Sequence, residues 1–298
     1  MFGLFKKKNN TKAAGTLAVG CGGSGCNIAN RLGRISDVNI LTVNTDRKGL
    51  IRSRSDRRIL LGEGTDAGCD GNVEKGRSLT IDSLEMINES IERFLNVVLL
   101  SGLGGGTGTG AAAIIAETAK KNGSRVMAIV SIPMSFESER RNAALNALDG
   151  LMKICDILIV LDGDRLVHID PMLGAREAFS VLDQMICESF MSLMELLEGN
   201  DGETMFRTMK GRTYTVSFAE GMHAEKVADT LAKGAMMSSP ATSQPMIFVR
   251  GNIPQNDTEK IITEKITKST GKEPTFIQGP EGRGMNLVMF VPISGPFS

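Results

Sequence analysis

The most informative stretch of the sequence is Ser101-Gly-Leu-Gly-Gly-Gly-Thr-Gly-Thr-Gly110. The apolar run from Phe94 to Leu100 precedes it and predicts a buried strand, and an alanine-rich run beginning at Ala111 predicts a helix. Glycines at such a junction permit positive φ angles and a close approach of a ligand to the main chain. Because the free N–H groups and dipole of a helix N-terminus favour an anion, the stretch predicts a phosphate-binding loop rather than a linker.

The loop differs from a Walker phosphate loop, which requires a Lys-Ser/Thr pair after the glycines. Here Gly110 is followed by alanine. A nucleotide at this loop would therefore be held by main-chain amides and by the hydroxyls of Thr107 and Thr109, with a metal ion sharing the phosphate charge.

The composition is that of an ordinary globular protein. The chain has 298 residues, of which 41% are hydrophobic and 23% charged. Lys+Arg and Asp+Glu both number 34, which gives no sign of a polyanion-binding protein, so nucleic acid is not an expected partner. Five cysteines without a CxxC pair and two histidines argue against a zinc site. The odd cysteine count and the absence of a signal peptide favour the cytoplasm.

The N-terminal segment, residues 1–14, leaves two interpretations open. It begins Met1-Phe-Gly-Leu-Phe-Lys-Lys-Lys8, an apolar tip followed by lysines. Such a tip can contact an anionic membrane weakly, and membrane contact through this segment or through an adaptor is one expectation. A flexible, solvated terminus is the other.

Apolar runs and helical periodicities alternate along most of the chain. This alternation predicts an α/β fold with a doubly wound parallel sheet over residues 15–173. A long helix with a wide apolar stripe is predicted over residues 174–198. The pattern then changes, and residues 199–298 predict a smaller α+β domain whose strands lie near residues 213–218, 246–250 and 285–291.

The first glycine loop supports a competing class of protein. Gly20, Gly22 and Gly25 form a G-x-G-x-x-G after a predicted strand, and Asp46 ends the next strand. This is the fingerprint of a dinucleotide-binding fold, so a NAD- or FAD-dependent oxidoreductase is the alternative. The second, richer loop at residues 102–110 suits a nucleoside triphosphate better.

Several motifs together resemble one known family. Gly104-Gly-Gly-Thr-Gly-Thr-Gly110 is similar to the tubulin signature in the form used by FtsZ, the prokaryotic division GTPase. The segments that resemble the family's other loops are 20–27, 44–46, 68–72, 133–141, 162–166, with Gly163 in place of the usual asparagine, and 178–183. The resemblance implies a site for GTP or GDP, with Mg²⁺ expected beside GTP. It implies that this site is formed by Gly22, Gly23, Asn27, Asn44, Gly71, Asn72, Gly104, Gly105, Gly106, Thr107, Gly108, Thr109, Glu137, Arg141, Phe179 and Asp183.

The resemblance also assigns roles within that set. It implies that Asn27, Phe179 and Asp183 bind guanine, and that Glu137 and Arg141 hold the ribose and phosphates. The family's fold further implies self-association as a longitudinal dimer or filament.

The catalytic loop departs from the family pattern. In the family, acidic residues after the central helix complete hydrolysis on the neighbouring subunit. Here residues 198–208 read Glu-Gly-Asn-Asp-Gly-Glu-Thr-Met-Phe-Arg-Thr, and the family's last acid corresponds to Thr204 or Met205. Asp201 and Glu203 are the carboxylates that could substitute, and an ordinary surface loop is the alternative. We therefore expect guanine-nucleotide binding with weak or absent GTP hydrolysis, in a protein of cell division or the cytoskeleton.

Overall fold

The computed structural model describes residues 15–62, 68–169, 172–236, 240–253, 257–281 and 284–294. The N-terminal segment 1–14 and its predicted membrane contact lie outside these residues. In the first half of the chain the elements follow in the order β1 (Thr16–Cys21), α1 (Gly22–Ile35), β2 (Asn39–Asn44), α2 (Arg47–Arg52), β3 (Arg57–Leu60), α3 (Val73–Asp82), α4 (Leu84–Ile91), β4 (Asn96–Gly102), α5 (Gly106–Lys121), β5 (Arg125–Ile132), α6 (Ser138–Ile154), β6 (Ile157–Asp162) and α7 (Gly163–Ile169).

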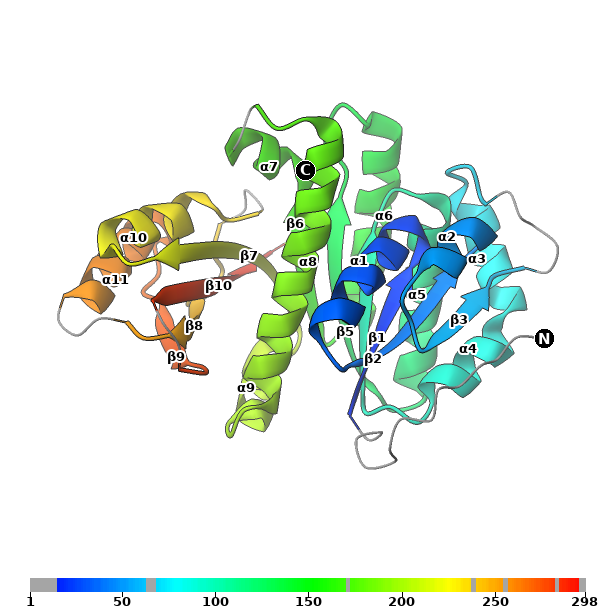
Figure 1. The fold of residues 1–298 in the computed structure, drawn as a ribbon, viewed down its shortest axis with the longest axis horizontal. Coiled ribbons are helices and arrows are strands. Elements are labelled where there is room, and N and C mark those ends of the chain that lie inside the picture. The colour runs from blue at the N-terminus through cyan, green and yellow to red at the C-terminus, as the bar shows by residue number, and fades with distance from the viewer. Residues whose placement is uncertain are drawn as a thin grey trace.

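The strands of this half form the predicted parallel sheet, in the order β3-β2-β1-β4-β5-β6. β1 and β6 are buried along their whole length, as expected for strands covered on both faces. Helices α5 and α6 pack into the core on one face, and α1 packs on the other (Figure 1). The sheet order reverses between β1 and β4, so the loops after these two strands lie side by side at the carboxyl edge, where open α/β sheets bind ligands.

The long helix is present as predicted. Helix α8 (Ala175–Glu198) has 24 residues and is roughly 36 Å long at 1.5 Å per residue. It passes in front of the sheet between the two halves of the molecule (Figure 1). Its inner stripe is buried, as the width of the apolar pattern indicates, and includes Ala178, Leu182, Ile186, Phe190 and Leu193.

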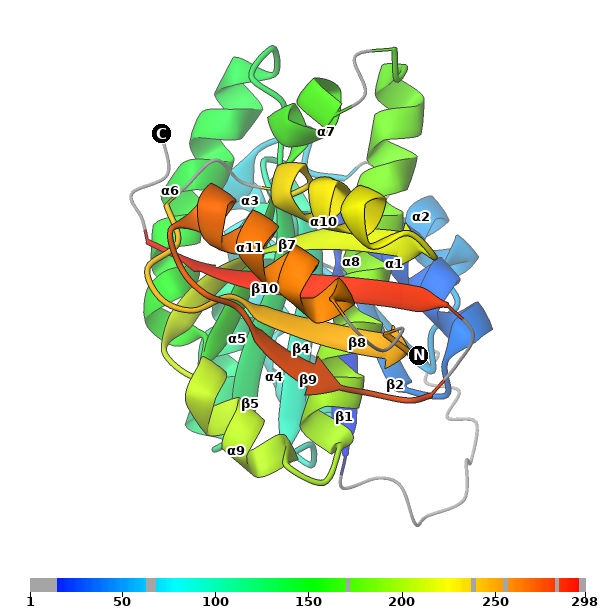
Figure 2. The same cartoon turned by 90° about the vertical axis from the view of Figure 1, so that its left-hand side faces the viewer.

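The last third of the chain forms the predicted smaller α+β part. Its elements are α9 (Gly202–Met209), β7 (Arg212–Gly221), α10 (Ala224–Lys233), β8 (Met246–Gly251), α11 (Thr258–Thr270), β9 (Thr275–Gln278) and β10 (Met285–Ile293). β10 lies between β7 and β8 and is antiparallel to both, and β9 is parallel to β8. Figure 2 shows α10 and α11 covering the outer face of these strands.

Strand pairing and ion pairs are among the contacts that connect this part to the rest of the molecule. Residues Ile157–Ile159 of β6 pair in parallel with Arg212–Tyr214 of β7, so all ten strands belong to one sheet. Arg250 on β8 donates from Nε to Glu195 of α8 at 2.6 Å, and its Nη1 lies 3.5 Å from Glu188. One sheet therefore runs through both parts of the molecule. The domain boundaries predicted at residues 173 and 198 stay a prediction.

Candidate nucleotide-binding site

Two helices begin side by side at the carboxyl edge of the sheet. α1 starts at Gly22 directly after β1, and α5 starts at Gly106 after β4. A Cβ atom added to Gly22, where φ is 72°, would lie 2.8 Å from the nitrogen of Gly108. Only glycine permits this approach, and it brings the free N–H groups of both helix starts together. The pair of N-termini favours binding of an anion such as phosphate.

A third segment packs against the start of α5. A Cβ atom on Gly106 would lie 2.7 Å from both the carbonyl oxygen of Asn72 and the Cβ of Cys69. Asn72 is the N-cap of α3, and its side chain accepts a hydrogen bond from the nitrogen of Lys75 at 2.9 Å. The segment 68–76 therefore forms the third wall beside the two helix starts.

These elements enclose a cavity of about 480 Å³, within the usual range of small-molecule sites. Most of the predicted nucleotide-binding residues line it, namely Gly23, Asn27, Asn44, Gly71, Gly105, Gly106, Thr107, Gly108, Glu137, Phe179 and Asp183. The cavity thus brings together predicted residues from Gly23 to Asp183. They follow strands on both sides of the point where the strand order reverses.

Five predicted residues are not in the cavity lining: Gly22, Asn72, Gly104, Thr109 and Arg141. Four of them shape the wall. Gly22 allows the starts of α1 and α5 to approach each other, and Asn72 caps α3. The hydroxyl of Thr109 accepts a hydrogen bond from the nitrogen of Gly104 at 2.7 Å, and Gly104 has a φ of 91° beside the main chain of Arg140.

The fifth, Arg141, is engaged by carboxylates. Its Nη1 and Nη2 donate to the two oxygens of Asp162 at 2.8 and 2.9 Å, and Nη1 lies 3.3 Å from Asp164. The neighbouring residue, Arg140, lines the cavity and forms an ion pair with Glu137. The cavity therefore receives its cation from Arg140, which the sequence motif did not single out.

The two carboxylate oxygens of Glu137 lie in different environments. Its Oε2 is bonded to Arg140, whereas its Oε1 is buried and has no hydrogen-bond partner among the described residues. A buried acceptor without a partner costs about 1–3 kcal/mol. Because Glu137 lines the cavity, Oε1 is an acceptor available to a ligand hydroxyl.

The opposite end of the cavity combines an aromatic ring with a buried carboxylate. Phe179 on α8 is 41% exposed, and Asp183 one turn further along is 9% exposed. Burial raises the pKa of Asp183 to about 6, and hydrogen bonds from Ser24 and Asn27 lower it less. The Oγ of Ser24 donates to Asp183 at 2.9 Å. This end can hold a planar ring whose edge carries hydrogen-bond donors.

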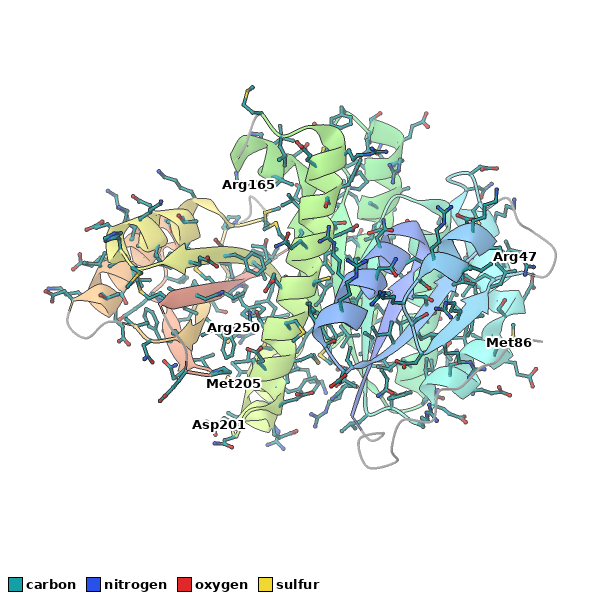
Figure 3. All side chains as sticks on the ribbon, viewed as in Figure 1. Arg47, Met86, Arg165, Asp201, Met205 and Arg250 are labelled. Carbon is teal, nitrogen blue, oxygen red and sulfur yellow. The ribbon has the colours of Figure 1, made fainter. Side chains whose placement is uncertain are left out.

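The two predicted catalytic acids lie far from this cavity in the same chain. Asp201 and Glu203 follow the C-terminal end of α8, about 30 Å from Phe179 at 1.5 Å per helical residue (Figure 3). Glu203 pairs with Arg125 at 2.5 Å and Arg207 at 3.1 Å, and the bond from Arg125 lowers its pKa. Neither acid can serve the cavity of its own subunit.

Asp46, the residue that the competing interpretation needs, also lines the cavity. Its side chain caps α2 by accepting from the nitrogen of Lys48 at 2.9 Å. The strand order β3-β2-β1-β4-β5-β6 is also that of dinucleotide-binding folds. Strand order alone thus does not separate the two classes of ligand.

Comparison with known proteins distinguishes the two interpretations, nucleoside triphosphate binding and dinucleotide binding, at the level of protein family. Residues 16–171 match the model of the Tubulin/FtsZ family, GTPase domain. The chain belongs to this family. It is 30% identical over 305 residues to "Cell division protein FtsZ 1" of Thermococcus kodakarensis, an alignment that covers 94% of this chain and 81% of the relative. It is 35% identical over 199 residues to FtsZ 1 of Methanocaldococcus jannaschii, covering 65% of this chain and about half, 54%, of that protein.

Solved structures of the Tubulin/FtsZ family have the same fold. A structure titled "FtsZ dimer, empty (M. jannaschii)" matches with a TM-score of 0.80 and 25% identity, covering 94% of this chain and 88% of that one. CetZ2 from Haloferax volcanii, in a GTPγS-bound protofilament, matches with a TM-score of 0.79 at 17% identity and shares the fold, covering 93% and 92% of the two chains. No helix in the described ranges is long and apolar enough to span a membrane.

Proposed function

We propose that the cavity binds GTP and GDP, that subunits self-associate with the cavity of one against the α9 end of the next, and that hydrolysis is slow. Family membership supports a GTPase-type site. The observation that carries the proposal is the cavity's two-ended chemistry. Paired helix N-termini at Gly22 and Gly106 lie at one end, and the ring of Phe179 with the buried carboxylate of Asp183 lies at the other.

The guanine end would discriminate by hydrogen bonding. Guanine has two adjacent donors, N1–H and the 2-amino group, and an ionised Asp183 can accept from both. Adenine lacks this pair of donors, so it would leave a buried carboxylate unsatisfied. Asn27 lines the same end and would add amide contacts, and the ring of Phe179 would stack on the base.

The ribose and phosphates would occupy the rest of the cavity. The unpartnered Oε1 of Glu137 would accept a hydrogen bond from a ribose hydroxyl. The N–H groups at the starts of α1 and α5, with Arg140, would hold the phosphates. Mg²⁺ would accompany GTP through phosphate oxygens and water, since the described residues include no group of three or more His, Cys, Asp or Glu side chains that could hold a metal.

Hydrolysis would depend on the neighbouring subunit. Asp201 and Glu203 are at the opposite end of α8 from the cavity, so only another copy can bring them to a γ-phosphate. Glu203 already pairs with two arginines, whereas the side chain of Asp201 has no partner among the described residues. One available carboxylate in a loop that lacks the family's last acid supports a low rate.

Relatives support the assembly part of the proposal. The titles of similar structures describe an FtsZ dimer and a CetZ2 protofilament, and the similar sequences are named cell division proteins. A role in cell division or the cytoskeleton follows from these relatives.

Two measurements on the purified chain test the proposal. Heat denaturation followed by chromatography identifies the released nucleotide, and GDP or GTP is expected. NAD or FAD would replace the proposal with the dinucleotide-dependent oxidoreductase that the G-x-G-x-x-G motif allows. Light scattering with GTP, alongside phosphate release, is expected to show assembly with slow turnover, and turnover without assembly would contradict the intersubunit mechanism.

A further inference from the structure

The balanced overall charge conceals one strongly basic segment. Residues 31–58 contain eight arginines and lysines but three acids, although the whole chain has 34 of each sign. The basic residues are Arg31, Arg34, Arg47, Lys48, Arg52, Arg54, Arg57 and Arg58. None of them lines the nucleotide cavity, although the charge of Arg31 lowers the pKa of Asp183.

The fold gathers most of this charge on one face, which we call the α1–α2 face, whereas Arg57 pairs with Glu89 of α4. Arg31 and Arg34 lie on the outer stripe of α1, with the i, i+3 spacing of neighbours on a helix. The chain after α2 returns against α1, since the nitrogen of Arg54 donates to Asn30 at 2.7 Å and a Cβ on Gly33 would lie 3.2 Å from that of Arg54. Figure 3 shows Arg47 on α2 pointing outward, on the side away from the C-terminal strands.

Much of this charge is not neutralised by the protein itself. Arg34, Lys48, Arg52 and Arg54 are exposed, and none of them forms an ion pair with a carboxylate in the part of the chain that the structure describes. The carboxylate of Asp56 pairs with none of these four cations and instead accepts a hydrogen bond from the nitrogen of Ile40 at 2.9 Å. The face therefore presents positive charge to an outside partner.

The same face exposes large apolar side chains and a hollow. Ile35, next to Arg34, is 56% exposed, and Ile51, next to Arg52, is 67% exposed. Arg31 and Arg34 also line a hollow of about 640 Å³, which shares Asn27, Phe179 and Asp183 with the proposed guanine end of the nucleotide cavity. Arg31 is fixed there by hydrogen bonds to Ser180 at 2.7 and 3.2 Å.

We propose that the α1–α2 face binds the anionic surface of a lipid bilayer, with the arginines at the lipid phosphates and the isoleucines entering the headgroup layer. Arginines interleaved with exposed aliphatic side chains match the polar and apolar layers of a membrane interface. A single-stranded nucleic acid would instead be expected to stack its bases on aromatic rings, and the large exposed apolar side chains of α1 and α2 are the isoleucines Ile35 and Ile51.

The face remains accessible in the proposed assembly. Self-association uses the cavity end and the α9 end of the molecule, whereas α1 and α2 lie on the face that Figure 1 turns toward the viewer. Each lysine or arginine near an anionic surface strengthens binding about fivefold. Binding of one subunit would be weak, and subunits joined in an assembly would bind more tightly because the contacts act together.

Sedimentation with vesicles tests the proposal on the full-length chain. The probes are vesicles of phosphatidylcholine alone and of phosphatidylcholine mixed with phosphatidylglycerol. We expect binding to the anionic vesicles only, and its loss when salt is raised from about 0.1 M to about 1 M, which shortens the Debye length from about 10 Å to about 3 Å.

Charge-reversed variants locate the binding. In the triple variant Arg34→Glu, Arg52→Glu, Arg54→Glu, binding to anionic vesicles should fall at least about tenfold. The matched control is Lys260→Glu, Lys268→Glu, Lys272→Glu, which makes the same change of net charge at exposed positions on and after α11 and should bind as the wild type does. Nucleotide binding and thermal unfolding, measured on both variants, should be unchanged and show that both are folded.

Three results would overturn the proposal. The first is equal vesicle binding by the two triple variants. The second is retention of binding by the Arg34, Arg52, Arg54 variant together with its loss in Lys6→Glu, Lys7→Glu, Lys8→Glu, which would place the contact in the N-terminal segment. The third is binding of DNA or RNA through the α1–α2 face without any binding to anionic vesicles. Failure of nucleotide binding in the wild type would refute the proposed function and leave this inference standing.

Discussion

Asp183→Asn should change the base that the cavity prefers. The carboxylate is 9% exposed and would accept hydrogen bonds from the N1–H and 2-amino groups of guanine. An asparagine has one acceptor and one donor group there, so its NH₂ would face the guanine 2-amino group without a favourable contact. Xanthine has a carbonyl oxygen at that position, which can accept from the NH₂.

The expected magnitude follows from the burial of the site. A hydrogen bond to a charged group contributes about 1.5–3 kcal/mol, and water cannot replace it at a position that is this buried. The variant loses one charged contact and leaves the guanine 2-amino group buried without an acceptor, which together cost about 3 kcal/mol or more, a decrease in GTP affinity of more than about 100-fold. Affinity for xanthosine triphosphate should rise in the same variant.

Equilibrium titration with fluorescent GTP, xanthosine triphosphate and ATP measures this change. Asp149→Asn, an exposed position on α6, is the matched control and should bind like the wild type. Thermal unfolding of the variant checks that the fold is retained. GTP affinity within about threefold of the wild type in a folded Asp183→Asn protein would refute the assignment of this end of the cavity to guanine.

Four further changes test other parts of the account. Burial raises the pKa of Asp183 to about 6, and the ionised form would bind guanine. GDP affinity should therefore fall about tenfold per pH unit below about pH 6 and be constant above about pH 7. A flat profile from about pH 5 to about pH 8 would contradict this role. Gly106→Ala places a methyl group 2.7 Å from the Asn72 carbonyl and should abolish nucleotide binding. The control Gly150→Ala lies on α6 with open space around it, and should stabilise the protein by about 0.5–1 kcal/mol in a denaturant titration. Arg125→Ala removes both the ion pair with Glu203 and a cation–π contact with Phe206 at 4.4 Å, and should lower the free energy of unfolding by about 1 kcal/mol; no change would show that α9 is held by other contacts. Asp201→Asn should reduce the rate of phosphate release at assembling concentrations without weakening GTP binding, and an unchanged rate would exclude Asp201 from hydrolysis.

The sequence predicted the parallel sheet, the long helix and most of the cavity lining, because these depend on local patterns. Fully apolar strands and glycines at strand–helix junctions have few alternative structures, and the cavity lies where two such junctions meet. The short helices α2, α7 and α9 were not predicted, since six to eight mostly polar residues have too little periodicity to indicate a helix.

Side-chain partners were the least predictable part. A motif can place Arg140 and Arg141 at the start of α6, but successive helical residues point in different directions, and Asp162 at the end of β6 decides which one is engaged. The hydrogen bond from Ser24 to Asp183 likewise joins residues 159 positions apart. The α1–α2 face was concealed because net charge averages over the whole chain, whereas the fold concentrates it locally.

The most direct test of the central claim is titration of the nucleotide-free wild-type protein with GDP, ATP and NAD⁺ by calorimetry. The account predicts one GDP bound per chain, with ATP and NAD⁺ bound at least about 100-fold more weakly because neither offers Asp183 two adjacent donors. Equal affinity for GDP and ATP, or tighter binding of NAD⁺, would contradict it.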